Sequence, residues 1–305
     1  MRPSIRVNLG RRFGALVGLC AAALVVGALP PASAAPTDTA ASDIASTGTA
    51  STGTAATAEG QAGPLVIAEA ENHSLGSQIR KHEAVTPNAR PADVGTLATV
   101  PGMDVSSHQG NVNWAGAWNN GARFAYVKAT EGTGYTNPYF AQQYNGSYNV
   151  GMIRGAYHFA LPGNSSGAAQ ANYFLANGGR WSKDGKTLPG ALDMEYNPYG
   201  ATCYGLSKAA MVSWIKAFSD TYRAATGVYP VIYTSTSWWT TCVGTSGDFS
   251  STNPLWVARY ASSVGTLPYN WGYHTIWQYA DSGTFPGDQN SFNGAYDRLQ
   301  ALANG

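Results

Sequence analysis

The chain has 305 residues, of which only 11% are charged while 12% are aromatic. The first 34 residues hold four of the 18 Lys and Arg and no acid, so the rest has 14 basic against 17 acidic residues, a net charge of −3. That balance excludes the basic surface on which nucleic-acid binding depends, and we expect no nucleic-acid partner. Polar, aromatic-rich secreted proteins often handle carbohydrate, because aromatic faces stack on sugar rings, although other secreted β-proteins share this composition.

Residues 1–34 have the pattern of a secretory signal peptide. Four Arg precede an apolar run over 13–29, and small residues up to Ala34 form an A-x-A cleavage pattern. The run is short for a membrane span, which needs about 20 residues, and no later stretch is long and apolar enough to cross a bilayer. We therefore expect a secreted, extracellular protein with no membrane partner. The pair Arg11-Arg12 leaves twin-arginine export open.

Residues 35–98 are predicted to be a largely disordered linker or pro-segment. Ala, Thr, Ser and Gly dominate residues 35–63, and such a stretch cannot bury enough apolar surface to fold. Within 69–83 the sequence allows a short amphipathic helix with Leu75 and Ile79 on one side. We expect the later part of this region to be loosely ordered or to lie against the domain that follows.

From residue 99 to 305, short β-rich runs alternate with helical stretches, which indicates a parallel sheet. The strand candidates are Val100–Val105, Phe124–Thr130, Met152–Phe159, Gly190–Tyr196, Tyr229–Ser235, Leu255–Tyr260, Thr275–Tyr279 and Asn290–Phe292. The clearest helix is Ser207–Ala225, with a capping Ser, one apolar stripe and Gly227 at its end. Eight strands in one domain favour a closed barrel over an open sheet. Helices become sparse after Tyr233, so the last strands are expected to be joined by loops.

The cysteines predict one disulfide. Cys20 lies in the signal peptide, which leaves Cys203 and Cys242 as an even pair in an oxidising compartment. The bridge would close a loop of about 40 residues and contribute roughly 3–4 kcal/mol in the chain-entropy model. The alternative is a catalytic thiol paired with His108 or His158. The five His residues lie far apart in the sequence, so we expect no metal and no other cofactor.

Polar residues stand at the expected carboxyl ends of the strands, where β/α barrels carry their catalytic groups. In chain order they are Asp104, Glu131, Tyr157 with His158, Asp193 with Glu195, Tyr233, Arg259, Gln278 and Asp288. Carboxylates are costly to desolvate without partners, so several converging on one barrel mouth indicate an acidic site. Taken alone, Asp104 fits a turn cap equally well, and His158 fits core packing as well as the site.

Asp193 and Glu195 are the most informative of these residues. Residues two apart on a strand point to the same face, roughly 6.6 Å apart along the chain. Two carboxylates that close cannot comfortably both ionise, so one pKa should rise. A proton donor beside an anion is what glycoside hydrolysis requires. The alternative is a structural ion pair with Arg259 or Arg154.

Together these segments resemble the glycoside hydrolase family 25 lysozymes, the Chalaropsis-type N-acetylmuramidases, in a secreted bacterial form. The matching segments, in family order, are Gly102–Ser106 with Gln109-Gly110, Phe124–Gly132, Gly155–Phe159, Leu192–Glu195, Trp277–Tyr279 and Asp288. The resemblance covers about residues 100–300. It implies an irregular TIM-like β/α barrel with eight strands and about five helices.

The resemblance also implies hydrolysis of the β-1,4 bond between N-acetylmuramic acid and N-acetylglucosamine in peptidoglycan. Glu195 would be the general acid and Asp193 its partner carboxylate, while Asp104 and Asp288 complete the acidic cleft, with Asp281 as the fallback for Asp288. Attack by the substrate's 2-acetamido group, oriented by Asp193, would retain configuration. Attack by water, with Asp104 or Asp288 as base, would invert it. We favour substrate assistance, because residues two apart on one strand lie on the same side of the sugar.

The remaining expectations concern binding. The substrate-binding candidates are Tyr157, Tyr196, Tyr233, Glu131, Arg259, Trp277 and Gln278, and for each aromatic residue core packing is as good an explanation. We expect a monomer that binds peptidoglycan glycan strands. Two alternatives are an inactive cell-wall glycan-binding barrel, which would have no need of a paired acid, and a chitinase-like hydrolase. The longer D-x-x-D-x-D-x-E signature of chitinases is absent, because residues 188–191 read Leu-Pro-Gly-Ala.

Overall fold

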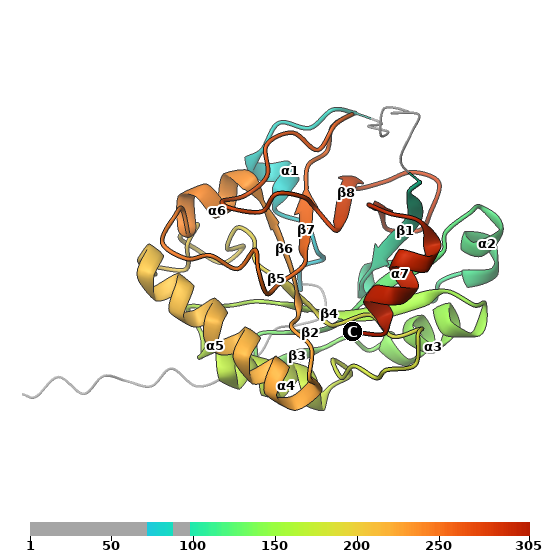
Figure 1. Ribbon diagram of the computed structural model, residues 1–305, viewed down its shortest axis with the longest axis horizontal. Helices are drawn as coiled ribbons and strands as arrows, with labels where there is room; N and C mark the ends of the chain where they lie inside the picture. Colours follow the sequence, from blue (N-terminus) through green and yellow to red (C-terminus); the bar gives the residue numbers. More distant parts are fainter. Residues whose placement is uncertain (1–71, 88–97) are drawn as a thin grey trace, which may run out of the picture. The chain divides into compact units, whose positions relative to one another are not determined.

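The computed structural model describes residues 72–87 and 98–305, so the predicted signal peptide and residues 35–71 lie outside the described residues. Eight strands form the barrel: β1 (Val100–Val105), β2 (Phe124–Glu131), β4 (Ile153–Phe159), β5 (Ala191–Asp193), β6 (Val231–Ser235), β7 (Leu255–Ala258), β8 (Ile276–Ala280) and β9 (Asp288–Phe292). The barrel closes because β1 pairs with both β2 and β9. A short strand, β3 (Tyr135–Thr136), pairs with the end of β2. The predicted TIM-like barrel is confirmed (Figure 1).

The last strand departs from the predicted parallel sheet. Strands β1 to β8 of the barrel pair in parallel, whereas β9 is antiparallel to both β8 and β1. Only residues 281–287 separate β8 from β9. A parallel connection needs a crossover of a dozen or more residues, so this short turn forces the chain to reverse. The reversal makes β9 begin, rather than end, at the mouth of the barrel.

Seven α-helices lie in the described residues, where about five were expected. They are α1 (Ile79–His82), α2 (Trp114–Asn119), α3 (Phe140–Asn149), α4 (Gly167–Ala176), α5 (Lys208–Thr226), α6 (Thr236–Cys242) and α7 (Tyr296–Ala303), with a 3₁₀ turn, η2, at Ser107–Gln109. The β7–β8 and β8–β9 connections are loops, as predicted. The exception is α6, which follows β6 directly. This helix spans only seven residues, which is too short for a helical period to be recognised in its apolar positions.

The helix α5 forms for the reasons that its sequence suggests. The Ser207 side chain accepts a hydrogen bond from the Ala210 backbone N–H, and Gly227 ends the helix in the left-handed conformation, with φ 87°. Its buried stripe runs from Met211 to Tyr222 and packs against α4. Figure 1 shows α4 and α5 side by side along one flank of the barrel. None of the described helices combines the length and the apolar character that crossing a membrane requires.

The predicted disulfide is confirmed. Cys203 and Cys242 are bonded, which ties the loop after β5 to the end of α6. The residue after Cys203, Tyr204, has a positive φ of 59°, a conformation that non-glycine residues adopt at a cost. The disulfide and this left-handed residue are therefore adjacent in the loop after β5.

Residues 72–87, which we call the mouth segment, lie against the carboxyl ends of the strands. The sequence places them in the linker or pro-segment. Their amphipathic pattern gives only one helical turn, α1, but Leu75 and Ile79 are both buried, at 0% and 1% exposure, in the main hydrophobic core. Burying two such side chains is worth roughly 1.5–3 kcal/mol each. The apolar anchors explain why this short stretch packs onto the barrel.

Candidate active site

Asp104 and Asp288 lie opposite each other where β1 and β9 pair. The Gln278 amide nitrogen donates to both carboxylates, at 2.9 Å to Asp104 and 3.0 Å to Asp288, and Asn290 donates to Asp104 at 2.7 Å. Burial raises the pKa of Asp104 to about 7, although the hydrogen bonds from Asn290 and Gln278 act in the opposite direction. Burial, and then the charge of Asp104, raises the pKa of Asp288 as well. Both carboxyl groups of this pair therefore hold a proton more readily than an exposed carboxyl group does.

The structure distinguishes Asp288 from its fallback, Asp281. Asp288 belongs to the acidic group, whereas Asp281 forms an ion pair with the exposed Arg80 of the mouth segment. The compact turn between β8 and β9 accounts for the difference, because it carries Asp281 outward before β9 returns to the mouth.

Asp193 and Glu195 lie on the other side of the mouth. The strand predicted over Gly190–Tyr196 ends at Asp193, so Glu195 lies two residues beyond β5 and not on the strand. Neither side chain is exposed, and burial is the main cause of a raised pKa in both, to about 8 for Glu195. For Asp193 the second cause is the negative charge of Glu195. Within the described part of the chain, neither oxygen of Asp193 has a hydrogen-bond partner. This pair therefore combines a carboxyl group whose raised pKa favours the protonated form with a second carboxyl group whose oxygens have no hydrogen-bond partner among the described residues.

No arginine neutralises this pair in the described structure. Arg154 bonds to the Lys186 carbonyl and forms an ion pair with Asp184 at 3.8 Å. The side chain of Arg259 is exposed. The alternative of a structural ion pair with either arginine therefore has no support in the geometry.

Glu131 is also buried, but it has a cation. Lys128, itself at 0% exposure, lies 2.5 Å from the Glu131 carboxylate. Burial alone would raise the pKa of Glu131, but Lys128 and the hydrogen bonds from His73 lower it to about 2. Lys128 was not among the predicted site residues. The signal that could have found it was a Lys that directly follows the apolar run Phe124–Val127 of β2, because a buried Lys is rarely tolerated without a charged partner.

A row of hydroxyl groups orients Gln278. Its amide oxygen accepts hydrogen bonds from Tyr233 at 2.7 Å and from Tyr260 at 3.0 Å, so its nitrogen must face the two aspartates. The indole N–H of Trp256 similarly donates to the Asn290 amide oxygen at 2.9 Å. Tyr260 and Asn290 were missed as site residues. Tyr260 ends a candidate strand and Asn290 alternates with Asp288, which is the signal that could have found them.

The remaining predicted residues divide into two groups. The hydroxyl groups of Tyr157 and Tyr196 reach the mouth, where they contact Leu75 and Glu83 of the mouth segment. Trp277 alternates with Gln278 on β8 and so faces away, donating instead to the Arg259 backbone carbonyl.

The side chain of His158 points away from the mouth. One ring nitrogen contacts the Thr130 hydroxyl and the other contacts the Gln170 side chain. Burial lowers the pKa of His158 to about 4, so the ring is neutral and packs in the core.

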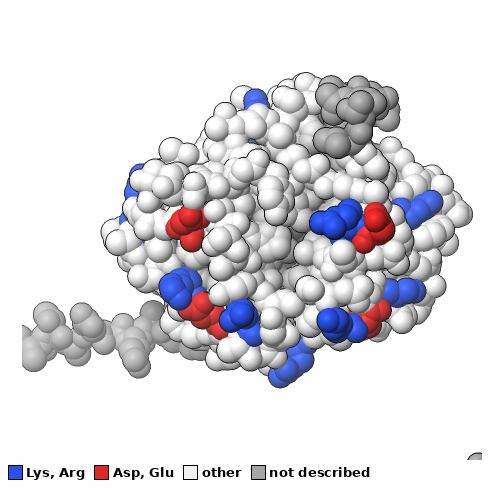
Figure 2. All heavy atoms as spheres, viewed as in Figure 1, with Lys and Arg blue, Asp and Glu red and all other residues white. Residues whose placement is uncertain are grey.

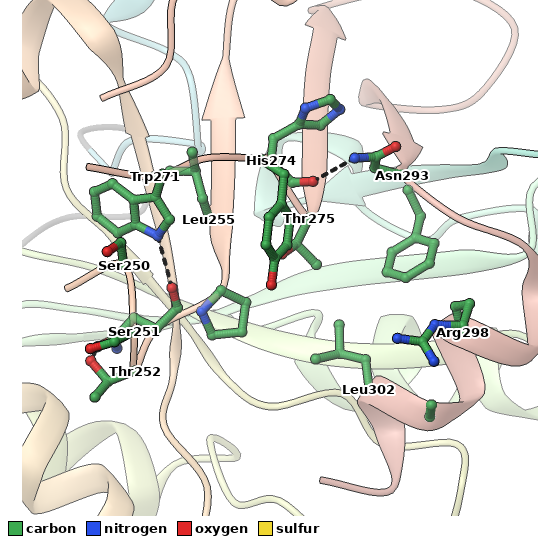
Figure 3. A pocket seen from close by; sticks show the side chains of 15 residues that line it. Ser250, Ser251, Thr252, Leu255, Trp271, His274, Thr275, Asn293, Arg298 and Leu302 are labelled. Carbon is green, nitrogen blue, oxygen red and sulfur yellow. Dashed lines mark hydrogen bonds between the residues drawn. The ribbon is translucent and has the colours of Figure 1, made fainter. Parts of the chain in front are cut away.

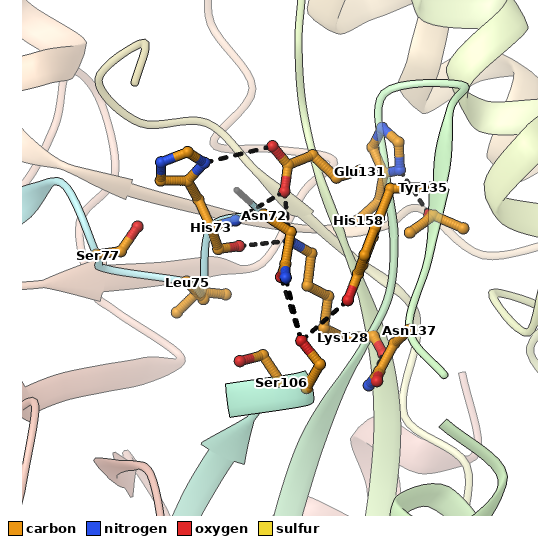
Figure 4. Close-up of polar contacts among 12 residues, drawn as sticks. Asn72, His73, Leu75, Ser77, Ser106, Lys128, Glu131, Tyr135, Asn137 and His158 are labelled. Atoms are coloured by element: carbon orange, nitrogen blue, oxygen red, sulfur yellow. Dashed lines mark hydrogen bonds and ion pairs between the residues drawn. The ribbon is translucent and has the colours of Figure 1, made fainter. Parts of the chain in front are cut away.

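The mouth of the barrel is filled by the mouth segment. Its backbone amides donate to Glu195 and Glu131, and Figure 4 shows Lys128 directed between the Glu131 carboxylate and the His73 carbonyl. A cavity of about 380 Å³ lies at the opposite end of the barrel, where Trp271 and His274 face Arg298 and Leu302 of α7 (Figure 3). None of the predicted site residues lines that cavity. On the face in Figure 2, Lys and Arg are interspersed with Asp and Glu.

A β/α barrel with buried, unneutralised carboxyl pairs at its mouth has the groups that glycoside hydrolysis needs. The similarity of the chain to known proteins supports this class of enzyme. The family model for glycosyl hydrolases family 25 matches residues 103–288. The N,O-diacetylmuramidase of Chalaropsis sp is 56% identical over 211 residues, which is 68% of this chain and 100% of that protein. Lysozyme M1 of Streptomyces globisporus is 46% identical over 235 residues, which is 75% of this chain and 80% of that protein.

The solved structures agree with the sequence relatives. The structure of a family GH25 lysozyme from Aspergillus fumigatus has 49% identity and a TM-score of 0.67, and it covers 68% of this chain and 100% of that chain. The chain belongs to glycosyl hydrolases family 25 and is a glycoside hydrolase. The predicted family is confirmed. The relatives come from fungi and from Streptomyces, so they establish the family and not its bacterial branch.

Proposed function

We propose that the chain is a secreted lysozyme that hydrolyses the β-1,4 bond between N-acetylmuramic acid and N-acetylglucosamine in peptidoglycan. The observation that carries this proposal is the buried pair Asp193 and Glu195, which has no arginine partner and lies in a family 25 barrel. The names of the relatives, muramidase and lysozyme, support the substrate.

In the proposed first step, Glu195 donates its proton to the glycosidic oxygen as the bond to the anomeric carbon breaks. The raised pKa of Glu195 supports this role, because a general acid must hold its proton at the working pH. The carbonyl oxygen of the substrate's 2-acetamido group forms the new bond to the anomeric carbon. Water then opens the cyclic intermediate, and the Glu195 carboxylate accepts the proton from that water. The product keeps its configuration.

Asp193 is assigned to the acetamido group. Its two buried oxygens lack hydrogen-bond partners within the described residues, so they can accept the acetamido N–H and orient the acetamido carbonyl oxygen toward the anomeric carbon. Asp104 and Asp288 are the bases that an inverting mechanism would need. Both already accept from the Gln278 amide, which supports a role in shaping the cleft instead.

Secretion and a monomeric state complete the proposal. The Cys203–Cys242 disulfide supports an oxidising compartment, and the N-terminal 34 residues supply the predicted export signal. Glycan strands are the proposed partner. The aromatic and hydroxyl groups of Tyr157, Tyr196 and Tyr260 at the mouth would meet them once the cleft is open.

A digest of purified peptidoglycan tests the proposed bond. Mass spectrometry of the borohydride-reduced products should find N-acetylmuramic acid at the new reducing ends, and glucosamine ends would overturn the muramidase assignment. Proton NMR of fresh product should show the β-anomer first. An initial α-anomer would replace substrate assistance with direct attack by water.

A further inference from the structure

The backbone of the mouth segment forms hydrogen bonds with Glu195, the proposed general acid. The Gly76 N–H donates to one Glu195 oxygen at 2.8 Å, and the Gln78 N–H donates to the other at 3.1 Å. A carboxyl group that protonates a glycosidic oxygen must touch that oxygen directly. With both Glu195 oxygens bound to the chain's own backbone, substrate and mouth segment cannot be in place together.

The same segment uses the neighbouring polar groups of the cleft. The His73 N–H donates to Glu131 at 2.9 Å, and the Leu75 N–H donates to the Tyr157 hydroxyl at 3.1 Å. Lys128 donates to the His73 carbonyl at 2.5 Å (Figure 4). These contacts place a turn of the backbone across the mouth, with amides directed to the acids and the His73 carbonyl directed to the lysine.

Further along, the mouth segment uses an aromatic surface. The His82 ring stacks on Tyr196 with 4.2 Å between ring centroids and an interplanar angle of 10°, and the Tyr196 hydroxyl donates to Glu83 at 3.0 Å. The Thr86 N–H donates to the Tyr260 carbonyl at 2.8 Å. A flat ring on a tyrosine face is also how a sugar ring would bind there.

Gly76 is the tightest point of this fit. Its φ is +79°, and a Cβ built on it would lie 2.2 Å from the Tyr260 hydroxyl and 2.6 Å from the Gln278 amide oxygen. No side chain other than hydrogen fits at this position without displacing the groups that orient Gln278. Because Gly76 belongs to the mouth segment, Gly76→Ala disrupts this fit while it leaves the sequence of the barrel unchanged.

The mouth segment lies outside the region that the family model matches, and not every family 25 barrel has a counterpart of it. The family model begins at residue 103, and the Chalaropsis relative is matched over its whole length by 68% of this chain. The solved Aspergillus chain is likewise matched in full by 68% of this chain. A family 25 barrel is therefore a complete fold without such a segment, and residues 98–305 are expected to fold alone.

We propose that residues 72–87 are an intramolecular inhibitor, so that the chain is a latent precursor activated when the segment is separated from the barrel. This inference rests on the proposed function for its rate measurement. Tethering makes inhibition effective even if each contact is weak. At an effective concentration of about 1 mM, a segment with a Kd of about 0.1 mM leaves roughly one site in ten free.

The test compares residues 98–305, the full chain, and the full chain carrying Gly76→Ala. Clearing of a purified cell-wall suspension should be roughly ten-fold faster for the barrel than for the full chain, the difference expected from tethered occupancy. Gly76→Ala should recover most of that rate. Ala84→Ser, a change of similar size at an exposed position of the same segment, should leave the full chain latent. Hydrogen exchange of the amides of residues 73–78 is followed on the same samples.

The outcomes separate this inference from the proposed function. Equal rates for the full chain and the barrel would overturn the inhibitor and leave the lysozyme standing. If no form hydrolyses the wall, the proposed function fails and hydrogen exchange decides the inference. Slow exchange at residues 73–78 that becomes fast in Gly76→Ala would support occupation of the mouth, and fast exchange in the unaltered chain would refute it.

Discussion

Two groups of buried carboxylates at the same barrel mouth behave in opposite ways. Glu131 has Lys128 at 2.5 Å and a pKa lowered to about 2, while Glu195 and Asp193 have no such partner and burial raises their pKa. All three side chains are equally buried. Burial favours the protonated form of all three carboxyl groups, and the neighbouring cation and hydrogen bonds reverse this preference only at Glu131.

The largest effect is expected when the proton donor is removed. Glu195→Gln in residues 98–305 should lower wall hydrolysis by roughly 10²–10⁴-fold, the range for a positioned general acid. Glu131→Gln, the matched change in the ionised group, should cost much less and act mainly on KM. Circular dichroism melting would confirm that both variants fold. If Glu131→Gln proved as damaging as Glu195→Gln, the division between the two groups would be lost.

Removing Lys128 should make the buried charge of Glu131 destabilising. Lys128→Met leaves Glu131 buried without its cation, and breaking a buried pair in this way typically costs about 3–5 kcal/mol. Urea unfolding of the full chain measures the loss. The double variant Lys128→Met with Glu131→Gln should recover much of the stability, because no charge then remains to be desolvated. A single variant as stable as the original chain would show that the ion pair does not hold Glu131.

The two groups should also give opposite dependences of stability on pH. The Glu195 pKa is raised from 4.5, so its contribution is complete below pH 4.5 and is lost as pH rises through about 8. The Glu131 pKa is lowered, so its contribution is present above pH 4.5 and is lost as pH falls through about 2. The melting temperature of the full chain should therefore decline as the pH rises from about 4.5 to about 8. Glu195→Gln should make that decline shallower, while the raised pKa values of Asp104, Asp193 and Asp288 leave part of it in place. An unchanged decline would assign it wholly to those other groups.

The smallest effect is expected from the loop that supports the donor. The Tyr204 hydroxyl donates to the Glu195 backbone carbonyl at 3.2 Å, and Tyr204 follows the disulfide-bonded Cys203. Tyr204→Phe removes one neutral hydrogen bond, worth about 0.5–1.5 kcal/mol. A few-fold fall in kcat with little change in KM is the expected result. A change confined to melting temperature would limit Tyr204 to a structural role.

The sequence predicts the barrel well because its signals are local. The strands alternate with recognisable helices, and α5 has its cap, stripe and terminal glycine within 21 consecutive residues. The acidic site could also be predicted, because the carboxyl ends of the barrel strands converge even when the strands lie far apart in the sequence. The antiparallel β9 was missed, since its direction depends on the length of one turn.

The occupation of the mouth by residues 72–87 could not be predicted in the same way. Gly76 and Gln78 bind Glu195 through backbone N–H groups, which every residue but proline possesses. No residue type marks such a contact. The buried anchors Leu75 and Ile79 were visible as an apolar pair, but their partners lie far away along the chain. Lys128 and Glu131 are three residues apart, yet only the structure shows that both are fully buried.

A carboxyl titration of the two glutamates tests the contrast most directly. Side-chain ¹³C signals of the full chain, assigned through Glu195→Gln and Glu131→Gln, report each group separately. Glu195 should titrate near 8, and Glu131 should stay ionised until the pH falls to about 2. Two carboxyls that titrate together near their ordinary pKa, or in the reverse order, would contradict this prediction.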